Sequence, residues 1–205
     1  MHITVFGASG RTGLLTIFQA LNQGYSVTAF ARHASNVTIQ HPNIQIIQGD
    51  ILEFDKVKQA VDGRDVIFCL VGVDKNKPNT ILSEGTRNIL RAMEECDIKR
   101  FICMSSVGLL GTDAGFWFGK IIIPLFLRHV FEDKNRQMRI IQESNADWII
   151  VRPVGLTDAP KTGSYTITFG LPMSKSVPRA DVADFMLKLC TDKKYDRQMP
   201  VISSF

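Results

Sequence analysis

The sequence predicts an α/β fold built on a doubly wound parallel sheet, with a small elaboration toward the C-terminal end. The first observation is alternation. From residue 2 to about residue 153, short β-rich runs alternate with segments whose apolar residues recur at helical spacing. The second is that several β-rich runs, such as "VIFCLV" at 66–71, are apolar throughout. Such strands are typical of a parallel sheet that helices cover on both faces.

The expected elements follow one another in alternating order. Strands are expected at 2–7, 25–31, 44–50, 64–72, 99–108 and 146–155. Helices are expected at 11–24, 54–63, 79–98 and over most of 116–144, with a break near Pro124. After about residue 153 the alternation loosens into a β segment at 163–169 and a helix at 178–190. We therefore expect one domain over 1–205, in which about 153–205 contributes to a substrate pocket.

Composition and charge bound the class of protein. The 205 residues are 45% hydrophobic and 21% charged, as in ordinary globular proteins. The net charge of +4 comes without a Lys/Arg block, so no nucleic-acid partner is expected. The most apolar segment, 115–131, is interrupted by basic residues and a proline, so no transmembrane segment is expected. The sequence has no signal-peptide pattern and no C-x-x-C motif, so we expect a cytoplasmic protein. Cys69 and Cys103 are predicted to be buried thiols. The oligomeric state stays open.

Three glycines stand where the first strand runs into the first helix, in "VFGASGRTGLL". Gly7 would make the turn, Gly10 would let a pyrophosphate approach the backbone, and Gly13 would let the helix pack on the strand. The N-terminus of that helix offers unpaired N–H groups to an anion. The alternative is a tight turn without a ligand. The cofactor-binding residues expected in this loop are Gly7, Ser9, Gly10, Arg11, Thr12 and Gly13.

The second strand bears on the choice of cofactor. A site for NAD usually places an Asp or Glu about 20 residues after the glycine loop, but the first acidic residue of this chain is Asp50. Instead, Arg32 follows the second strand, where its guanidinium would hold a 2′-phosphate. Arg11 could reach the same phosphate. We therefore expect NADP(H) as the cofactor, the alternative being that Arg32 is only a solvated loop residue.

Several segments together resemble a known family. They are "VFGASGRTG", "GDILEFDKV", "VIFCLVG", "SEGTRNILRAM", "ADWIIVRP" and the ending "TGSYTITF", "DVADFML" and "YDRQMP". The chain resembles the atypical short-chain dehydrogenase/reductase superfamily, in particular its NAD(P)H-binding, NmrA-like branch. Within that branch it is most similar to the biliverdin reductase B/flavin reductase group. The resemblance implies a Rossmann-type fold.

The resemblance also implies further contacts with the cofactor. These would come from residues at the carboxyl ends of strands, where open α/β sheets bind ligands. Asp50 and Ile51 would lie at the adenine. The residues implied along the ribose and pyrophosphate are Leu70, Val71 and Gly72, and those implied at the nicotinamide are Met104, Ser105, Pro153 and Val154.

The chain departs from the family pattern at two positions. The typical Tyr-x-x-x-Lys acid/base pair is absent, because no tyrosine (Tyr25, Tyr165, Tyr195) has a lysine four residues later. Val154 stands where the flavin/biliverdin reductases have an active-site histidine, which argues against a tetrapyrrole substrate. Ser106 matches a serine of that group. We take Ser106 as the candidate catalytic residue, donating a hydrogen bond to a substrate carbonyl, with a hydroxyl that satisfies local backbone as the alternative.

These observations predict an NADPH-dependent reductase that transfers hydride to a flavin-like or quinone-like acceptor, a small aromatic molecule. The alternatives are a nucleotide-sensing regulatory protein without turnover and, less favoured, an isomerase or epimerase. The aromatic residues of 115–131 would line an acceptor pocket, form a dimer surface or belong to the core; they are Phe116, Trp117, Phe118, Phe126 and Phe131. Arg152 is expected to pair with a carboxylate such as Asp158 or Asp181, with contact to an acidic substrate as the alternative.

Overall fold

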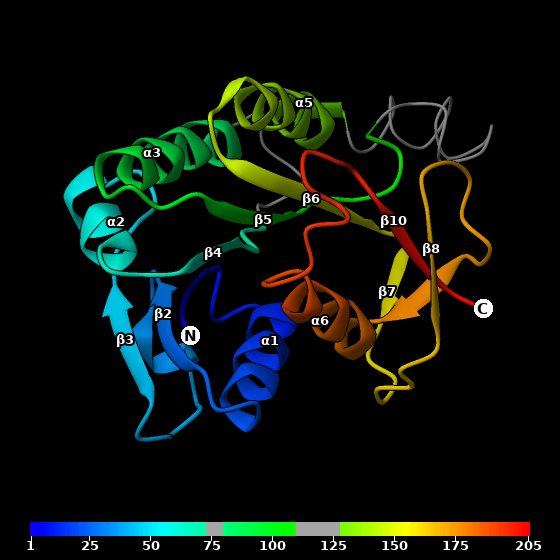
Figure 1. Cartoon of the computed structure of the whole chain (residues 1–205), viewed down its shortest axis with the longest axis horizontal. Coiled ribbons are helices and arrows are strands. Elements are labelled where there is room, and N and C mark those ends of the chain that lie inside the picture. Colours follow the sequence, from blue (N-terminus) through cyan, green and yellow to red (C-terminus); the bar gives the residue numbers. More distant parts are fainter. Residues whose placement is uncertain (73–79, 110–127) are drawn as a thin grey trace.

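A computed structural model describes residues 1–72, 80–109 and 128–205 of the chain. The helices and strands of the described residues alternate over most of their length (Figure 1). In chain order they are β1 His2–Phe6, α1 Arg11–Asn22, β2 Ser26–Ala31, the short 3-10 helix η1 Ala34–Asn36, β3 Ile44–Gln48, α2 Phe54–Val61, β4 Val66–Cys69, α3 Ile81–Glu95, β5 Arg100–Met104, α5 Arg128–Glu143, β6 Asp147–Pro153, β7 Gly155–Thr157, β8 Tyr165–Thr168, β9 Ser176–Pro178, α6 Arg179–Lys188 and β10 Val201–Ser204.

The strands form one large sheet and one small sheet. The large sheet has the order β3-β2-β1-β4-β5-β6-β10-β8, and β7 pairs with β9 in the small one. Every neighbouring pair of the large sheet is parallel except β10 and β8. The predicted doubly wound α/β fold is confirmed, because the strand order reverses direction at β1 and helices cover both faces.

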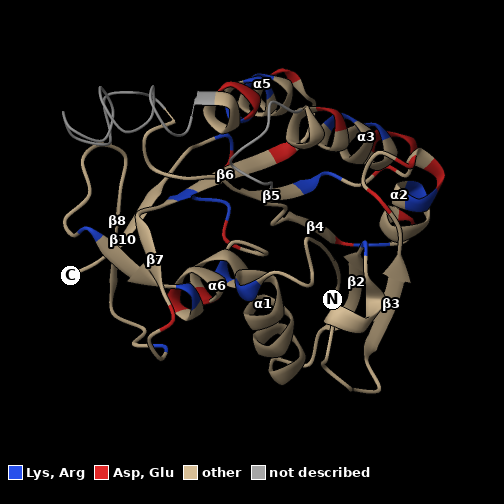
Figure 2. Ribbon diagram, turned by 180° about the vertical axis from the view of Figure 1, so that it is seen from behind, with Lys and Arg blue, Asp and Glu red and all other residues tan. Residues whose placement is uncertain are grey.

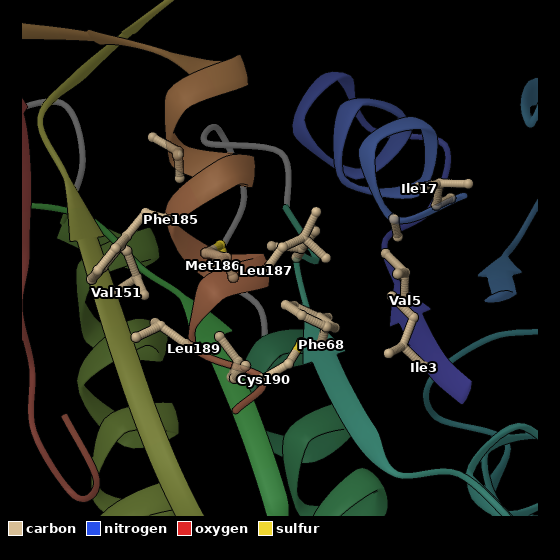
Figure 3. Close-up of a cluster of buried hydrophobic side chains, with 14 of the residues drawn as sticks. Ile3, Val5, Ile17, Phe68, Val151, Phe185, Met186, Leu187, Leu189 and Cys190 are labelled. Atoms are coloured by element: carbon tan, nitrogen blue, oxygen red, sulfur yellow. The ribbon is translucent and has the colours of Figure 1, made fainter. Parts of the chain in front are cut away.

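Each face of the sheet has its own hydrophobic core. Helices α1 and α6 cover one face, where side chains from β1, α1, β4, β6 and α6 meet (Figure 3). Helices α2, α3 and α5 cover the other face. Strand β4 shows why the central strands are apolar throughout. Its Val66 and Phe68 pack into the first core, and its Ile67 and Cys69 pack into the second.

The C-terminal elaboration is more regular than the sequence indicates. Strand β10 inserts beside β6 in parallel, with Val201 opposite Arg152, and β8 then pairs antiparallel with β10 at the edge. The sequence analysis found β8 and α6 but missed β7, β9 and β10. Of the aromatic residues in 115–131, Phe131 alone lies within the described residues, and its side chain is buried.

Candidate cofactor site and active site

The loops that follow β1 and β4 meet at the carboxyl edge of the sheet. The amide of Leu70 donates a hydrogen bond to the carbonyl of Phe6 at 2.9 Å. A Cβ atom at Gly7 would lie 2.6 Å from the Leu70 carbonyl carbon, and Gly7 has a φ of +82°. Only glycine fits this close approach and this left-handed backbone. The glycine loop is therefore held against the segment after β4.

Gly13 and Gly10 have different surroundings in the same loop. A Cβ atom at Gly13 would lie 2.3 Å from the carbonyl oxygen of Gly7, so the fold itself requires a glycine there. A Cβ atom at Gly10 would meet only that same oxygen, at 3.3 Å, and Gly10 has φ −74° and ψ 155°. Gly10 is exposed. The backbone of Gly10 suits any residue and a Cβ atom would press on one carbonyl oxygen, so packing restricts this position less than it restricts Gly13, whereas a ligand approaching the loop would require a glycine.

The N-terminus of α1 is open. The first helical hydrogen bond runs from the amide of Leu14 to the carbonyl of Gly10, at 2.9 Å. No side chain caps the helix, and its first turn contains no acidic residue. Within the described residues, the amides of Arg11, Thr12 and Gly13 have no acceptor. Thr12 is buried and Ser9 is exposed. This end of α1 therefore offers N–H groups and a positive dipole end to an anion.

The N-terminus of α3 is closed by the protein itself. The carboxylate of Asp133, from α5, accepts hydrogen bonds from the amides of Leu82 and Ser83 at 2.9 and 3.3 Å. Because this helix end already holds a carboxylate, it has no capacity left for a phosphate. Of these two helix N-termini, only that of α1 can take a pyrophosphate.

Arg11 is the first residue of α1, and Arg32 follows β2. The guanidinium of Arg11 forms an ion pair of 2.8 Å with Asp158, which follows β7, and Arg179 pairs with the same carboxylate at 2.7 Å. Arg32 is exposed immediately after β2. Arg32 stands at the end of β2, where the sequence analysis expects the 2′-phosphate. That Arg11 reaches the same phosphate stays a prediction.

Figure 2 shows little charge along α1 and β3, in contrast to the charged outer faces of α2, α3 and α5. The acid-free first quarter of the sequence is thus also a weakly charged region of the structure. Asp50, the first acidic residue, is half-buried after β3 and accepts a hydrogen bond from the amide of Leu52 at 3.0 Å. Ile51 beside it is buried, and its side chain lies where a Cβ atom of Gly85 would be, at 2.1 Å.

The remaining expected contacts line the same edge of the sheet. The amides of Ser105, Val107 and Val154 donate to backbone carbonyls of β6 and β10, so the chain stays extended past the ends of β5 and β6. Leu70, Ser105, Pro153 and Val154 are buried, Val71 and Met104 are half-buried, and Gly72 is exposed. The Ser105 hydroxyl is buried and has no hydrogen-bond partner in the part of the chain that the structure describes.

Ser106 and Lys134 form the polar centre of this edge. The ammonium group of Lys134, from α5, donates a hydrogen bond of 2.8 Å to the hydroxyl oxygen of Ser106, after β5. Both side chains are half-buried, and the Lys134 ammonium lies 5.7 Å from the ring centre of Phe131. A hydroxyl that accepts from an ammonium group keeps its own proton for another acceptor.

Lys134 is a candidate functional residue that the sequence analysis missed. The search for a Tyr-x-x-x-Lys pair started from the tyrosines, and the residue four positions before Lys134 is Val130. A search for a lysine on the helix after the fifth strand would have found it.

Two buried thiols lie just behind the edge. Cys69 and Cys103 stand opposite each other on β4 and β5, and both are buried, as expected. The hydrogen bond with Cys69, together with burial, raises the pKa of the Cys103 thiol well above its usual value. Burial and the raised pKa both disfavour the reactive thiolate form of Cys103.

The two carboxylates that the sequence analysis named for Arg152 have other partners among the described residues. Arg152 is buried and its Nε donates to the carbonyl of Met199 at 2.8 Å. Asp158 pairs with the two arginines named above, and Asp181 accepts from the amides of Thr162 and Gly163. Both carboxylates organise the loop before β8 and its contacts with α1 and α6.

A protein-family model described as NAD(P)H-binding matches residues 7–193. The chain belongs to this family. Membership confirms the expected class of cofactor, a nicotinamide dinucleotide. Assignment to the biliverdin reductase B/flavin reductase group stays a prediction, and so does the cytoplasmic location. None of the helices in the described segments is long and apolar enough to cross a membrane.

Solved structures share the fold over essentially the whole chain. The oxidoreductase ylbE from Lactococcus lactis has a TM-score of 0.86 at 22% identity, covering 100% of this chain and 91% of that one. A short-chain dehydrogenase/reductase from Veillonella parvula, solved in complex with NADP, has a TM-score of 0.86 at 21% identity, with coverages of 99% and 94%. ChuY from Escherichia coli O157:H7, an anaerobilin reductase, has a TM-score of 0.83 at 24% identity, with coverages of 100% and 97%.

Curated relatives are similar in sequence but longer. A chloroplastic protein from Arabidopsis thaliana is 28% identical over 176 residues, which are 79% of this chain and 61% of the relative. A 3β-hydroxysteroid dehydrogenase/isomerase from Mycobacterium tuberculosis is 26% identical over 154 residues, 69% of this chain and 41% of the relative. The chain thus spans less than two thirds of the length of these relatives.

Proposed function

We propose that this protein is an NADPH-dependent oxidoreductase that transfers hydride to a flavin-like or quinone-like acceptor. The observation that carries the proposal is the Ser106–Lys134 hydrogen bond at the same sheet edge as the open N-terminus of α1. The open N-terminus of α1 suits the pyrophosphate of a dinucleotide. The Ser106–Lys134 pair suits an acceptor oxygen on which negative charge develops. The relatives named as oxidoreductases and dehydrogenases support the reaction class.

The chain's own residues fit the cofactor. The amides at the start of α1 would bind the pyrophosphate, with Gly10 leaving room for it. Arg32 would hold the 2′-phosphate, since no carboxylate after β2 stands ready to accept from a ribose 2′-hydroxyl. The ends of β5 and β6, at Met104, Ser105, Pro153 and Val154, would flank the nicotinamide ring.

Bound NADPH supplies the hydride. Ser106 would donate its proton in a hydrogen bond to a carbonyl oxygen of the acceptor, which orients the acceptor. Lys134, through its contact with Ser106, would place a positive charge where negative charge develops on that oxygen. In a flavin or quinone this charge is delocalised over the ring, and water can supply the proton that completes the two-electron reduction. A simple ketone lacks this delocalisation and needs a positioned acid.

The side chain at 154 bears on the class of acceptor. Val154 is buried in the core beside β6 and offers no proton donor. This favours a flavin or quinone over a linear tetrapyrrole, although ChuY, which shares the fold, is an anaerobilin reductase.

The test is NADPH oxidation by the purified protein with a panel of free flavins, quinones, biliverdin and simple ketones. We expect turnover with flavins or quinones and little with ketones. Ser106→Ala should lower kcat by less than about tenfold and Lys134→Met by about tenfold to a hundredfold, because the charge contributes more than the orienting hydroxyl. Robust ketone reduction would contradict the proposed chemistry. NADPH binding without any turnover would favour the nucleotide-sensing alternative.

A further inference from the structure

Asp133 is a fully buried carboxylate that joins α5 to the start of α3. Its Oδ2 atom accepts from the amide of Leu82 at 2.9 Å. Its Oδ1 atom accepts from the amide of Ser83 at 3.3 Å and from the Ser83 hydroxyl at 2.5 Å. Arg136, one turn along α5, approaches Oδ1 at 3.4 Å. Partners on both oxygens and a favourable helix dipole fix the side chain in one place.

The hydrogen bonds of Asp133 connect the helix that carries Lys134, α5, to the first turn of α3. Lys134 follows Asp133 directly in α5 and reaches Ser106 after β5. Leu82 and Ser83 belong to the first turn of α3, which follows the segment after β4. Figure 1 shows α3 and α5 side by side on one face of the sheet. A shift of α5 along α3 would therefore move the Lys134 ammonium relative to Ser106.

We infer that Asp133 is the positioning residue for Lys134. By accepting from the two amides of α3, the carboxylate sets the position of α5 so that the ammonium of Lys134 meets the hydroxyl of Ser106. Asp133 touches neither cofactor nor acceptor and acts only through Lys134. The kinetic part of this inference rests on the proposed function, whereas the structural part concerns Lys134 alone.

A second hydrogen bond between the same helices provides a matched control. The side-chain amide of Gln137 on α5 donates to the hydroxyl of Thr86 on α3 at 2.8 Å, and both side chains are buried. Thr86→Val removes this contact between the helices at nearly constant side-chain volume. It is expected to lower the melting temperature without changing the reactivity of Lys134 or the kinetic constants.

The first measurement needs no turnover. The purified chain is labelled with acetic anhydride, and acetylation of Lys134 is compared by mass spectrometry with that of the exposed Lys56. Asp133→Asn replaces one of the two carboxylate oxygens by an NH2 group. This group cannot accept a hydrogen bond from an amide of α3. We expect it to raise the labelling rate of Lys134 about fivefold or more relative to Lys56, because the lysine is freed from its contact. Unchanged labelling of Lys134 would overturn the inference, whatever the activity of the protein.

The second measurement is a double-mutant cycle on turnover. We expect Asp133→Asn to lower kcat by about tenfold to a hundredfold while the KM for NADPH changes by less than about twofold. In a Lys134→Met background it should cost nothing further, because a positioning residue has no effect once its lysine is gone. Equal losses in both backgrounds would mean a structural role and would overturn the inference. If Asp133→Asn does not fold, Ser83→Ala removes one donor to the same carboxylate and should raise Lys134 labelling in the same direction.

A wild type without turnover would contradict the proposed function and not this inference. The labelling rate of Lys134 would then by itself decide whether Asp133 positions this lysine.

Discussion

Gly10 and Gly13 stand three residues apart, yet only Gly13 is required by the packing of the protein. We predict that Gly13→Val destabilises the fold by about 3 kcal/mol, because its Cβ would lie 2.3 Å from the Gly7 carbonyl oxygen. Gly10→Val should leave the unfolding free energy within about 1 kcal/mol of the wild type. It should nevertheless weaken NADPH binding at least about tenfold, because the side chain fills the approach to the α1 amides.

Denaturant unfolding and cofactor titration of the two variants separate these effects. Normal NADPH affinity in a folded Gly10→Val protein would show that the pyrophosphate binds elsewhere.

Arg32 carries the prediction of cofactor preference. We expect the wild type to bind NADPH more tightly than NADH, and Arg32→Ala to lose about 1.5–3 kcal/mol of NADPH binding with little change for NADH. Arg11→Ala should have a smaller effect, because Asp158 already holds the Arg11 guanidinium. Titration of both cofactors into the three proteins checks this. Equal affinities for NADPH and NADH in the wild type would refute it.

At single positions, the sequence predicts those features whose residues are close together in the chain. The glycine loop is visible because turn, helix start and glycine spacing lie within a few residues. The Ser106–Lys134 contact is not, since it depends on how α5 docks on α3 through Asp133. The contact of Arg152 with Met199 is not visible in the sequence for a similar reason. A strand that the sequence did not reveal, β10, brings the carbonyl of Met199 to it.

At the scale of elements, α6 is tied to β8 and to the loop before it by one carboxylate. Asp184 accepts from Lys161 at 2.5 Å and from the Tyr165 hydroxyl at 2.9 Å, and it pairs with Lys188 at 2.8 Å. Burial alone would raise the pKa of Asp184, but these three hydrogen bonds outweigh burial and hold it below its usual value. The charged form of Asp184 therefore stabilises the attachment of β8 and its preceding loop to α6.

This depressed pKa predicts how stability depends on pH. Because the carboxylate is favoured in the folded state, its contribution is complete above the unfolded pKa of about 4 and is lost as the pH falls through the folded value. We expect Asp184→Asn to lower the unfolding free energy by about 2 kcal/mol at neutral pH, and the difference from the wild type to shrink below about pH 4. Urea titrations from neutral to acidic pH test this. A constant difference at every pH would contradict the assigned charge.

The alternation of elements up to β6 could be read from the sequence because each central strand is buried on both faces. The later strands could not. Strand β9 has three residues and β10 has four, too few for a periodic pattern, and β10 follows a proline. Their places in the two sheets are set by contacts with β6, β7 and β8, which are distant in sequence.

At the scale of the whole molecule, β10 and β8 extend the same sheet that carries the glycine loop. Arg100, at the start of β5, fastens the segment that leads into β10. Its guanidinium donates to the carbonyls of Leu189 and Asp192 at 2.9 and 2.5 Å and pairs with Asp196. A shared sheet and this buried link favour a single cooperative unit over residues 1–205.

We predict that Arg100→Met lowers the unfolding free energy by about 3 kcal/mol, because it leaves two carbonyls and a carboxylate without their partner. Arg87→Met is the control, since its ion pair with Glu84 is exposed on α3 and should contribute less than about 1 kcal/mol. Unfolding followed by far-UV circular dichroism and by tryptophan fluorescence should give coincident transitions in the wild type and in both variants. If Arg100→Met instead separated the two transitions, the C-terminal part from about residue 153 would unfold on its own. The chain would then consist of two units and not one.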